Sequence, residues 1–85
     1  MKQFTHEVKD PMGLHARPAG LLVKACAAYQ SIITLSTPTA KADARRLMAV
    51  MRMGVKQGTP LTVTCEGPDE EQAAAELQAY LAENI

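Results

Sequence analysis

The sequence predicts an α+β sandwich, in which helices cover one face of a mainly antiparallel sheet. Three observations lead to this fold class. Several short segments alternate apolar and polar side chains, as half-buried strands do, and others repeat apolar residues at helical spacing. Glycine and proline separate many of these segments, and the resulting order is strand, helix, strand, strand, helix, strand, helix. A chain of 85 residues has room for one domain, which we expect to span 1–85.

The first strand is predicted at residues 4–8. Its inward positions are Phe4, His6 and Val8. We expect His6 to have a structural role there rather than to act as a ligand or a switch. A loop at 10–13 leads to a helix with Pro18 in its first turn, where no amide donor is lost. The core side of this helix carries Ala19, Leu22, Val23 and Cys26.

The middle of the chain predicts a strand at 32–37, a weak return strand at 40–44 and a short helix at 45–53 that ends at Gly54. The Pro38-Thr39 turn is not of the favoured hairpin type, so we expect irregular pairing of these two strands. The apolar residues of the helix are Leu47, Met48, Val50, Met51 and Met53. They cover too much of its circumference for all of them to be buried.

The last part of the chain predicts a strand at 60–66 and a final helix after the Gly67-Pro68 turn. The inward positions of the strand are Leu61, Val63 and Cys65. Asp69 is the predicted N-cap of the helix, and Gln72 completes a variant of the capping box. The apolar stripe of the helix is Ala74, Leu77 and Leu81.

Composition excludes several classes of protein. No apolar stretch approaches the roughly 18–20 residues of a membrane span, and no signal-peptide core is present. We therefore expect a cytoplasmic protein without membrane insertion. Cys26 and Cys65 lie on apolar stripes and are expected to be reduced core thiols. Zero net charge, with one Phe and two Tyr, argues against a nucleic-acid surface.

The charges are separated along the chain. All nine basic residues lie within positions 2–56, whereas most of the nine acidic residues follow Cys65. A basic body with an acidic final helix can steer an acidic partner protein. The alternative is an ordinary solvated surface.

The segment Gly13-Leu14-His15-Ala16-Arg17-Pro18 is the strongest candidate for chemistry. It places His15 at the predicted cap of a helix, where free backbone amides and the helix dipole attract an anion. Arg17 adds a guanidinium suited to phosphate. We expect these positive surroundings to keep the imidazole largely neutral near neutral pH, and a neutral ring nitrogen is a nucleophile. The alternative is a solvated or capping histidine.

No Asp, Ser or Cys is expected near enough to His15 to complete a catalytic triad. No second His lies at metal-ligand spacing, so we predict neither a metal site nor a cofactor.

The segment from Gly13 to Ala19 resembles the active-centre signature of the HPr family, the histidine-containing phosphocarriers of the bacterial sugar phosphotransferase system. The resemblance extends over essentially the whole chain. It includes Leu47-Met48-Ala49-Val50-Met51 with Gly54, Lys56-Gln57-Gly58 and Glu66-Gly67-Pro68-Asp69-Glu70.

This resemblance implies an open-faced β-sandwich of four antiparallel strands with three helices on one face. It implies that His15 accepts a phosphoryl group on Nδ1 from phosphorylated enzyme I, with phosphoenolpyruvate as the ultimate donor. His15 then passes the group to enzyme IIA of sugar permeases, so the protein is a carrier, expected to be monomeric, rather than a turnover enzyme. Arg17 and the amides of Ala16 and Arg17 would hold the phosphoryl oxygens.

The resemblance also gives a use to the exposed apolar side chains. The expected docking patch consists of Leu21, Leu47, Met48 and Met51. Its expected basic rim, facing acidic partners, consists of Lys24, Arg46 and Arg52. A small adaptable patch suits a transient carrier, because its partners must exchange.

One position departs from the family pattern. Many members carry a regulatory serine where this chain has Arg46, and an arginine cannot accept that phosphate. We predict that the protein escapes this kinase control, which leaves room for a specialised paralogue in a nitrogen-type or dihydroxyacetone phosphotransfer chain. A regulatory binding module on the same scaffold is a second reading. A small RNA-binding domain is a third, using Arg45, Arg46, Arg52 and Lys56.

Overall fold

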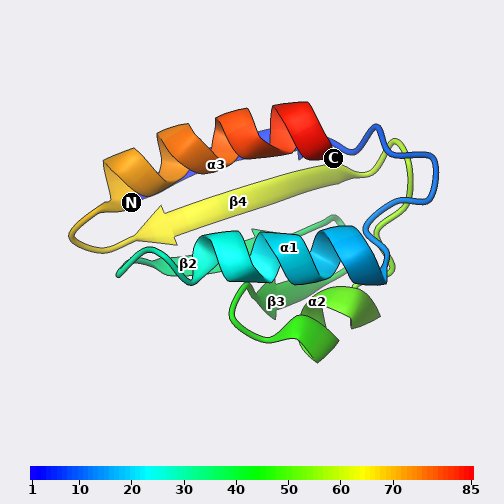
Figure 1. Cartoon of the computed structure of the whole chain (residues 1–85), viewed down its shortest axis with the longest axis horizontal. Coiled ribbons are helices and arrows are strands. Elements are labelled where there is room, and N and C mark those ends of the chain that lie inside the picture. The colour runs from blue at the N-terminus through cyan, green and yellow to red at the C-terminus, as the bar shows by residue number, and fades with distance from the viewer.

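In a computed structural model that describes all 85 residues, four strands form one antiparallel sheet and three helices cover one of its faces (Figure 1). The elements in chain order are β1 (Lys2–Glu7), α1 (Ala16–Cys26), β2 (Ile32–Ser36), β3 (Lys41–Asp43), α2 (Leu47–Arg52), β4 (Pro60–Glu66) and α3 (Glu70–Asn84). The predicted order of elements and the open-faced fold class are both confirmed. No helix has the length and apolar character that crossing a bilayer requires.

The sheet has the strand order β1-β4-β2-β3, so β4 lies between the first two strands of the chain. Val63 of β4 is paired with Phe4 of β1 on one side and with Leu35 of β2 on the other. Alternation along β4 buries one side of the strand against the helices. The opposite side is polar, and there the hydroxyls of Thr5 and Thr62 lie 3.0 Å apart.

The core lies between the sheet and the helices. From α1 it takes Ala19, Leu22 and Cys26, and from α3 it takes Ala73, Leu77 and Leu81. Val23 and Ala74, both on predicted stripes, are half-buried at its margin. Cys26 and Cys65 are free and buried, as predicted, and burial raises the pKa of the Cys26 thiol to about 12. Such thiols remain protonated and unreactive.

The pairing of β2 with β3 is regular, so the predicted irregularity is wrong. Thr34 is paired with Asp43, and the register continues without a bulge to Ser36 and Lys41. The side chain of Thr37 compensates for the poor turn sequence: its hydroxyl oxygen accepts the amide of Ala40 at 3.0 Å. The backbone closes the same turn, because the amide of Thr37 donates to the carbonyl of Ala40 at 2.8 Å.

The helix predicted from residue 45 begins later, at Leu47, because Asp43 organises a turn in front of it. One carboxylate oxygen of Asp43 accepts the amide of Arg45 at 2.9 Å, and its carbonyl accepts the amide of Arg46 at 3.0 Å. Arg45 therefore lies outside the helix, and Arg46 is its N-cap.

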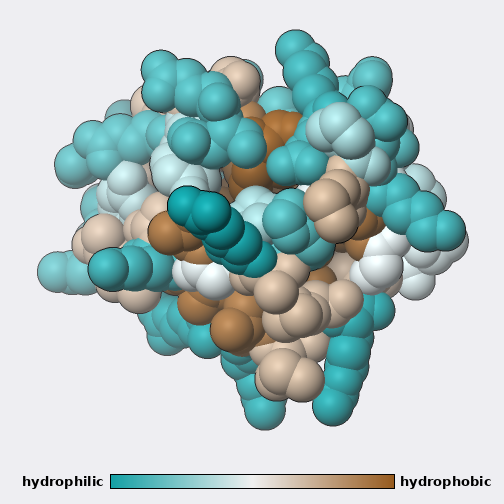
Figure 2. All heavy atoms as spheres, turned by 45° about the vertical axis from the view of Figure 1, so that its right-hand side comes forward, coloured by the Kyte–Doolittle hydropathy of each residue, from teal (hydrophilic) through white to brown (hydrophobic).

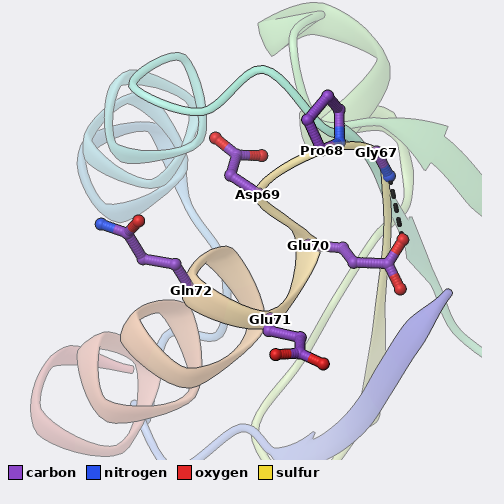
Figure 3. A pocket seen from close by; sticks show the side chains of 6 residues that line it. All are labelled: Gly67, Pro68, Asp69, Glu70, Glu71 and Gln72. Carbon is purple, nitrogen blue, oxygen red and sulfur yellow. Dashed lines mark hydrogen bonds between the residues drawn. The ribbon is translucent and has the colours of Figure 1, made fainter.

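The start of α3 also differs from the prediction (Figure 3). Asp69 is the N-cap, but its side chain makes no capping hydrogen bond, and Gln72 takes no part in a capping box. The carboxylate instead accepts the amides of Gln30 and Ser31 from the connection between α1 and β2. Glu70 accepts the amide of Gly67 at 3.2 Å, the bond drawn in Figure 3. A long-range partner thus replaces the predicted local one.

Candidate phosphoryl-binding site

His15 is the N-cap of α1. Its extended backbone (φ −84°, ψ −174°) leads into the helix, and its carbonyl accepts the amide of Ala19 at 2.9 Å. Its side chain makes no capping hydrogen bond, so the imidazole is free for another role. The amides of Ala16 and Arg17 belong to the first turn, which leaves them without partners inside the helix. Since α1 has no acidic residue in its first turn, its positive end is not neutralised there.

The loop before His15 is held against the chain segment that follows α2. The amide of Leu14 donates to the carbonyl of Val55 at 3.1 Å, and the side chain of Leu14 is buried. Gly13 has φ +68°, and an added Cβ would lie 2.2 Å from the same carbonyl oxygen. Only glycine fits this close approach, which fixes where the chain enters the helix.

A carboxylate lies beside the imidazole, contrary to the expectation that no Asp would be near. Oδ2 of Asp10 is 3.9 Å from Nε2 of His15, within the range of an ion pair. The surroundings of His15 are therefore not purely positive. Sequence reasoning assigned Asp10 to a loop and found no signal for this contact.

Arg17 and His15 line the same cavity, which has a volume of about 190 Å³. The other lining residues are Asp10, Pro18, Leu21, Tyr80, Asn84 and Ile85. No carboxylate lies within ion-pair distance of Arg17, so its guanidinium is available to an incoming anion. Sequence analysis missed the contribution of α3, since Tyr80 and Asn84 lie far from His15 along the chain.

The expected docking residues lie at the surface. Leu21, Leu47, Met48 and Met51 are among the large exposed apolar side chains, with Met48 at 61%. Leu21 belongs to α1 and the other three residues to α2, and the two helices pack against each other. Met12, in the loop before His15, is also exposed and was not singled out from the sequence. The rim residues Lys24, Arg46 and Arg52 are exposed as well.

Figure 2 brings forward the end of the molecule that carries the β1–α1 loop. Apolar surface there is broken up by hydrophilic side chains rather than forming one continuous area. Small apolar areas surrounded by hydrophilic side chains are typical of transient protein–protein interfaces, whereas permanent interfaces are larger and more hydrophobic. No group of three His, Cys, Asp or Glu side chains lies close enough together to hold a metal ion.

Comparison with known proteins agrees with this fold. Residues 2–83 match the family described as "PTS HPr component phosphorylation site". The phosphocarrier protein HPr of Lysinibacillus sphaericus is 40% identical over 82 residues, which cover 96% of this chain and 91% of the relative. The crystal structure of HPr-C-His from Thermoanaerobacter tengcongensis superposes with a TM-score of 0.92 at 37% identity, covering 99% of this chain and 94% of that one.

A third relative has a different name. The HPr-like protein Crh of Bacillus subtilis is 35% identical, with both chains fully covered. A crystal structure of Crh, with a TM-score of 0.76 and 98% of that chain covered, is described as a swapped dimer. Fold and relatives together define the class of HPr and HPr-like proteins. The chain belongs to the HPr family, and the predicted resemblance is confirmed.

Proposed function

We propose that this protein carries a phosphoryl group on Nδ1 of His15. It receives the group from phosphorylated enzyme I, for which phosphoenolpyruvate is the ultimate donor, and passes it to enzyme IIA of sugar permeases in the cytoplasm. It is a stoichiometric carrier rather than a turnover enzyme. The observation that carries this proposal is the free imidazole of His15 at the N-cap of α1, beside a guanidinium without a carboxylate partner.

The chemistry of the site supports a phosphoryl group over other anions. Amides of Ala16 and Arg17 can donate to two phosphoryl oxygens, and the positive end of α1 favours their charge. The planar guanidinium of Arg17 can donate to two oxygens at once. Nε2 of His15 faces the carboxylate of Asp10, which leaves Nδ1 as the nitrogen free to form the bond to phosphorus.

The surface around the site supports partner exchange. The docking patch offers adaptable methionines to an apolar partner surface, and its cationic rim suits acidic proteins. We propose that the protein acts as a monomer, because its partners need access to His15 and to the exposed docking patch. Sedimentation at micromolar concentration tests this, and a stable dimer would contradict it.

A second candidate function is that of a specialised paralogue within the same family, and Arg46 favours it. This residue is the N-cap of α2, and it cannot accept the phosphate that the family's serine accepts. The chain would then escape that kinase, and its phosphorylation state would depend on His15 alone. Detection of kinase-dependent phosphate on a serine or threonine of this chain would refute the escape.

Intact mass after incubation with enzyme I, magnesium and phosphoenolpyruvate tests the carrier function. The wild type should gain one acid-labile phosphoryl group, and His15→Ala should gain none. His6→Gln is the matched control, because His6 is the only other histidine and should not affect the gain. If the wild type gains no mass while the same enzyme I phosphorylates another HPr, the carrier proposal fails and regulatory binding becomes the better reading.

A further inference from the structure

Asp10 and His15 form a contact that the chemistry above leaves unexplained. Oδ2 of the carboxylate lies 3.9 Å from Nε2 of the imidazole. Both side chains are partly shielded from solvent, with 27% and 37% exposed, so their interaction is weakened by water less than at a fully open surface.

The backbone holds Asp10 in place from three directions. Its amide donates to the carbonyl of Ile85 at 2.9 Å, and its carbonyl accepts the amide of Gly13 at 2.9 Å. Oδ1 accepts the amide of Met12, also at 2.9 Å. Only Oδ2 has no such partner, and it is the oxygen that faces the imidazole. Arg17 lines the same cavity but lies beyond ion-pair distance from this carboxylate.

We infer that Asp10 is a positioning residue for phosphoryl transfer: it holds the proton of His15 on Nε2 and keeps the lone pair of Nδ1 directed at phosphorus. This inference rests on the proposed carrier function. A neutral imidazole carries one proton, and the nitrogen that faces an anion is the one that keeps it. In hydrolase triads a hydrogen-bonded carboxylate orients an imidazole and fixes its tautomer. Here the 3.9 Å separation is longer than a hydrogen bond, so the carboxylate of Asp10 acts through its charge.

The transfer step needs no proton to leave. The lone pair of Nδ1 forms a bond to phosphorus while the bond between phosphorus and the donor atom of enzyme I breaks, and that electron pair stays on the donor atom. The ring of His15 then carries phosphorus on Nδ1, a proton on Nε2 and a positive charge. Asp10 stabilises that charge as it develops, because its carboxylate is already in place.

Asp10→Asn is the variant that separates charge from structure. The amide oxygen can still accept the amide of Met12, so the turn is retained, while the amide nitrogen would donate toward Nε2. Asp43→Asn is the matched control, because Asp43 accepts the amide of Arg45 in the same kind of turn, also at 2.9 Å. Two readouts are needed: ring ¹⁵N chemical shifts of His15 at alkaline pH, and kcat/KM for phosphorylation by enzyme I.

The expected result is a ring protonated mainly on Nε2 in the wild type and in Asp43→Asn. In Asp10→Asn the population should move toward the Nδ1-protonated tautomer, and kcat/KM should fall roughly tenfold. Unchanged tautomers in Asp10→Asn overturn the inference, and so does a changed tautomer with an unchanged rate. If the wild type is not phosphorylated at all, the carrier function fails instead, and the ¹⁵N shifts alone decide whether Asp10 sets the tautomer.

Discussion

The carboxylate of Asp69 accepts a 2.9 Å hydrogen bond from the backbone amide of Ser31, which lies 38 positions earlier in the chain. The same oxygen accepts the hydroxyl of Ser31, and the other oxygen accepts the amide of Gln30 at 2.8 Å. Ser31 is the buried polar residue of the core margin, so its amide and hydroxyl have little access to water. The bonds join the start of α3 to the connection between α1 and β2.

Replacing Asp69 by alanine should lower stability, because a buried amide loses its acceptor. We expect Tm to fall by roughly 5 °C. Glu71→Ala is a suitable control, since Glu71 is exposed in the same turn and makes only a 3.8 Å ion pair with Lys2. If Asp69→Ala has the same Tm as the wild type, the Ser31 amide has found another hydrogen-bond acceptor.

The same carboxylate predicts a loss of stability in acid. Hydrogen bonds from Ser31 and Gln30 lower the pKa of Asp69 below its ordinary 3.8 in the folded protein. This contribution is complete above the ordinary pKa and is lost as pH falls through the folded one, because protonation removes the acceptor. Urea unfolding at pH values on either side of 3.8 should show a steeper acid loss for the wild type than for Asp69→Asn. Parallel curves would contradict the assignment.

His6 predicts a second pH dependence, at higher pH. Burial lowers its pKa below the ordinary 6.5, Lys9 acts in the same direction, and Nε2 is buried without a hydrogen-bond partner. The unfolded chain therefore binds more protons than the folded one as pH falls below 6.5, and the free energy of unfolding decreases across that window. Above 6.5 the effect vanishes, since the ring is neutral in both states.

The check is urea unfolding of the wild type and His6→Gln at a pH on each side of that window. The variant should lose less stability than the wild type on acidification through that window. Equal losses in both proteins would assign the effect to groups other than His6.

Alanine substitutions at Gly13 and Gly54 distinguish the cost of a steric clash from the cost of a positive φ. Their φ angles are +68° and +66°, but an added Cβ meets the Val55 carbonyl oxygen at 2.2 Å only at Gly13. Gly54→Ala should cost about 1 kcal/mol, as a positive φ does alone. Gly13→Ala should cost clearly more, roughly 3 kcal/mol, because the loop must also move off Val55.

Alanine substitution at Gly20 should instead increase stability. It lies inside α1 with nothing within 4 Å of an added Cβ. Gly20→Ala should raise stability by about 0.5–1 kcal/mol, since alanine loses less backbone entropy in a helix. Chemical denaturation measures all three variants, and similar costs at Gly13 and Gly54 would show that the Val55 contact is not limiting.

The docking patch predicts a change in partner affinity without a change in fold. Met48→Asp should raise KM for phosphorylation by enzyme I about tenfold, because it puts a charge in an apolar contact facing an acidic partner. Ile32→Asp is the matched control: Ile32 has 58% exposure against 61% for Met48, but lies at the start of β2 (Figure 1). Equal KM values for the two variants would place the contact elsewhere.

Local features of the site were predictable from the sequence. His15, Arg17 and Pro18 lie within four consecutive positions, so the start of the helix fixes their relative placement whatever packs around them. The contact with Asp10 was not predictable, because it depends on the positive φ of Gly13 and on the hydrogen bond that ties Asp10 to Ile85. The cavity wall from α3 depends on where that helix packs.

The errors in the fold have the same origin. The hydroxyl of Thr37 stabilises an unfavourable turn sequence by accepting the amide of Ala40. The carboxylate of Asp69 accepts the amide of Ser31 instead of capping its own helix. In each case a side chain accepts a backbone amide that local propensity does not specify.

The sequence by itself determined the order of elements, the buried faces and the residue that begins α1, because periodicity and capping act within a few neighbouring positions. Tertiary structure alone decided which charges and hydroxyls meet across elements: Asp10 with His15 after a reversing loop, and Asp69 with Ser31 across 38 positions. Such pairs depend on how helices pack on the sheet, and they form because a polar group removed from water must find a partner where packing has placed it.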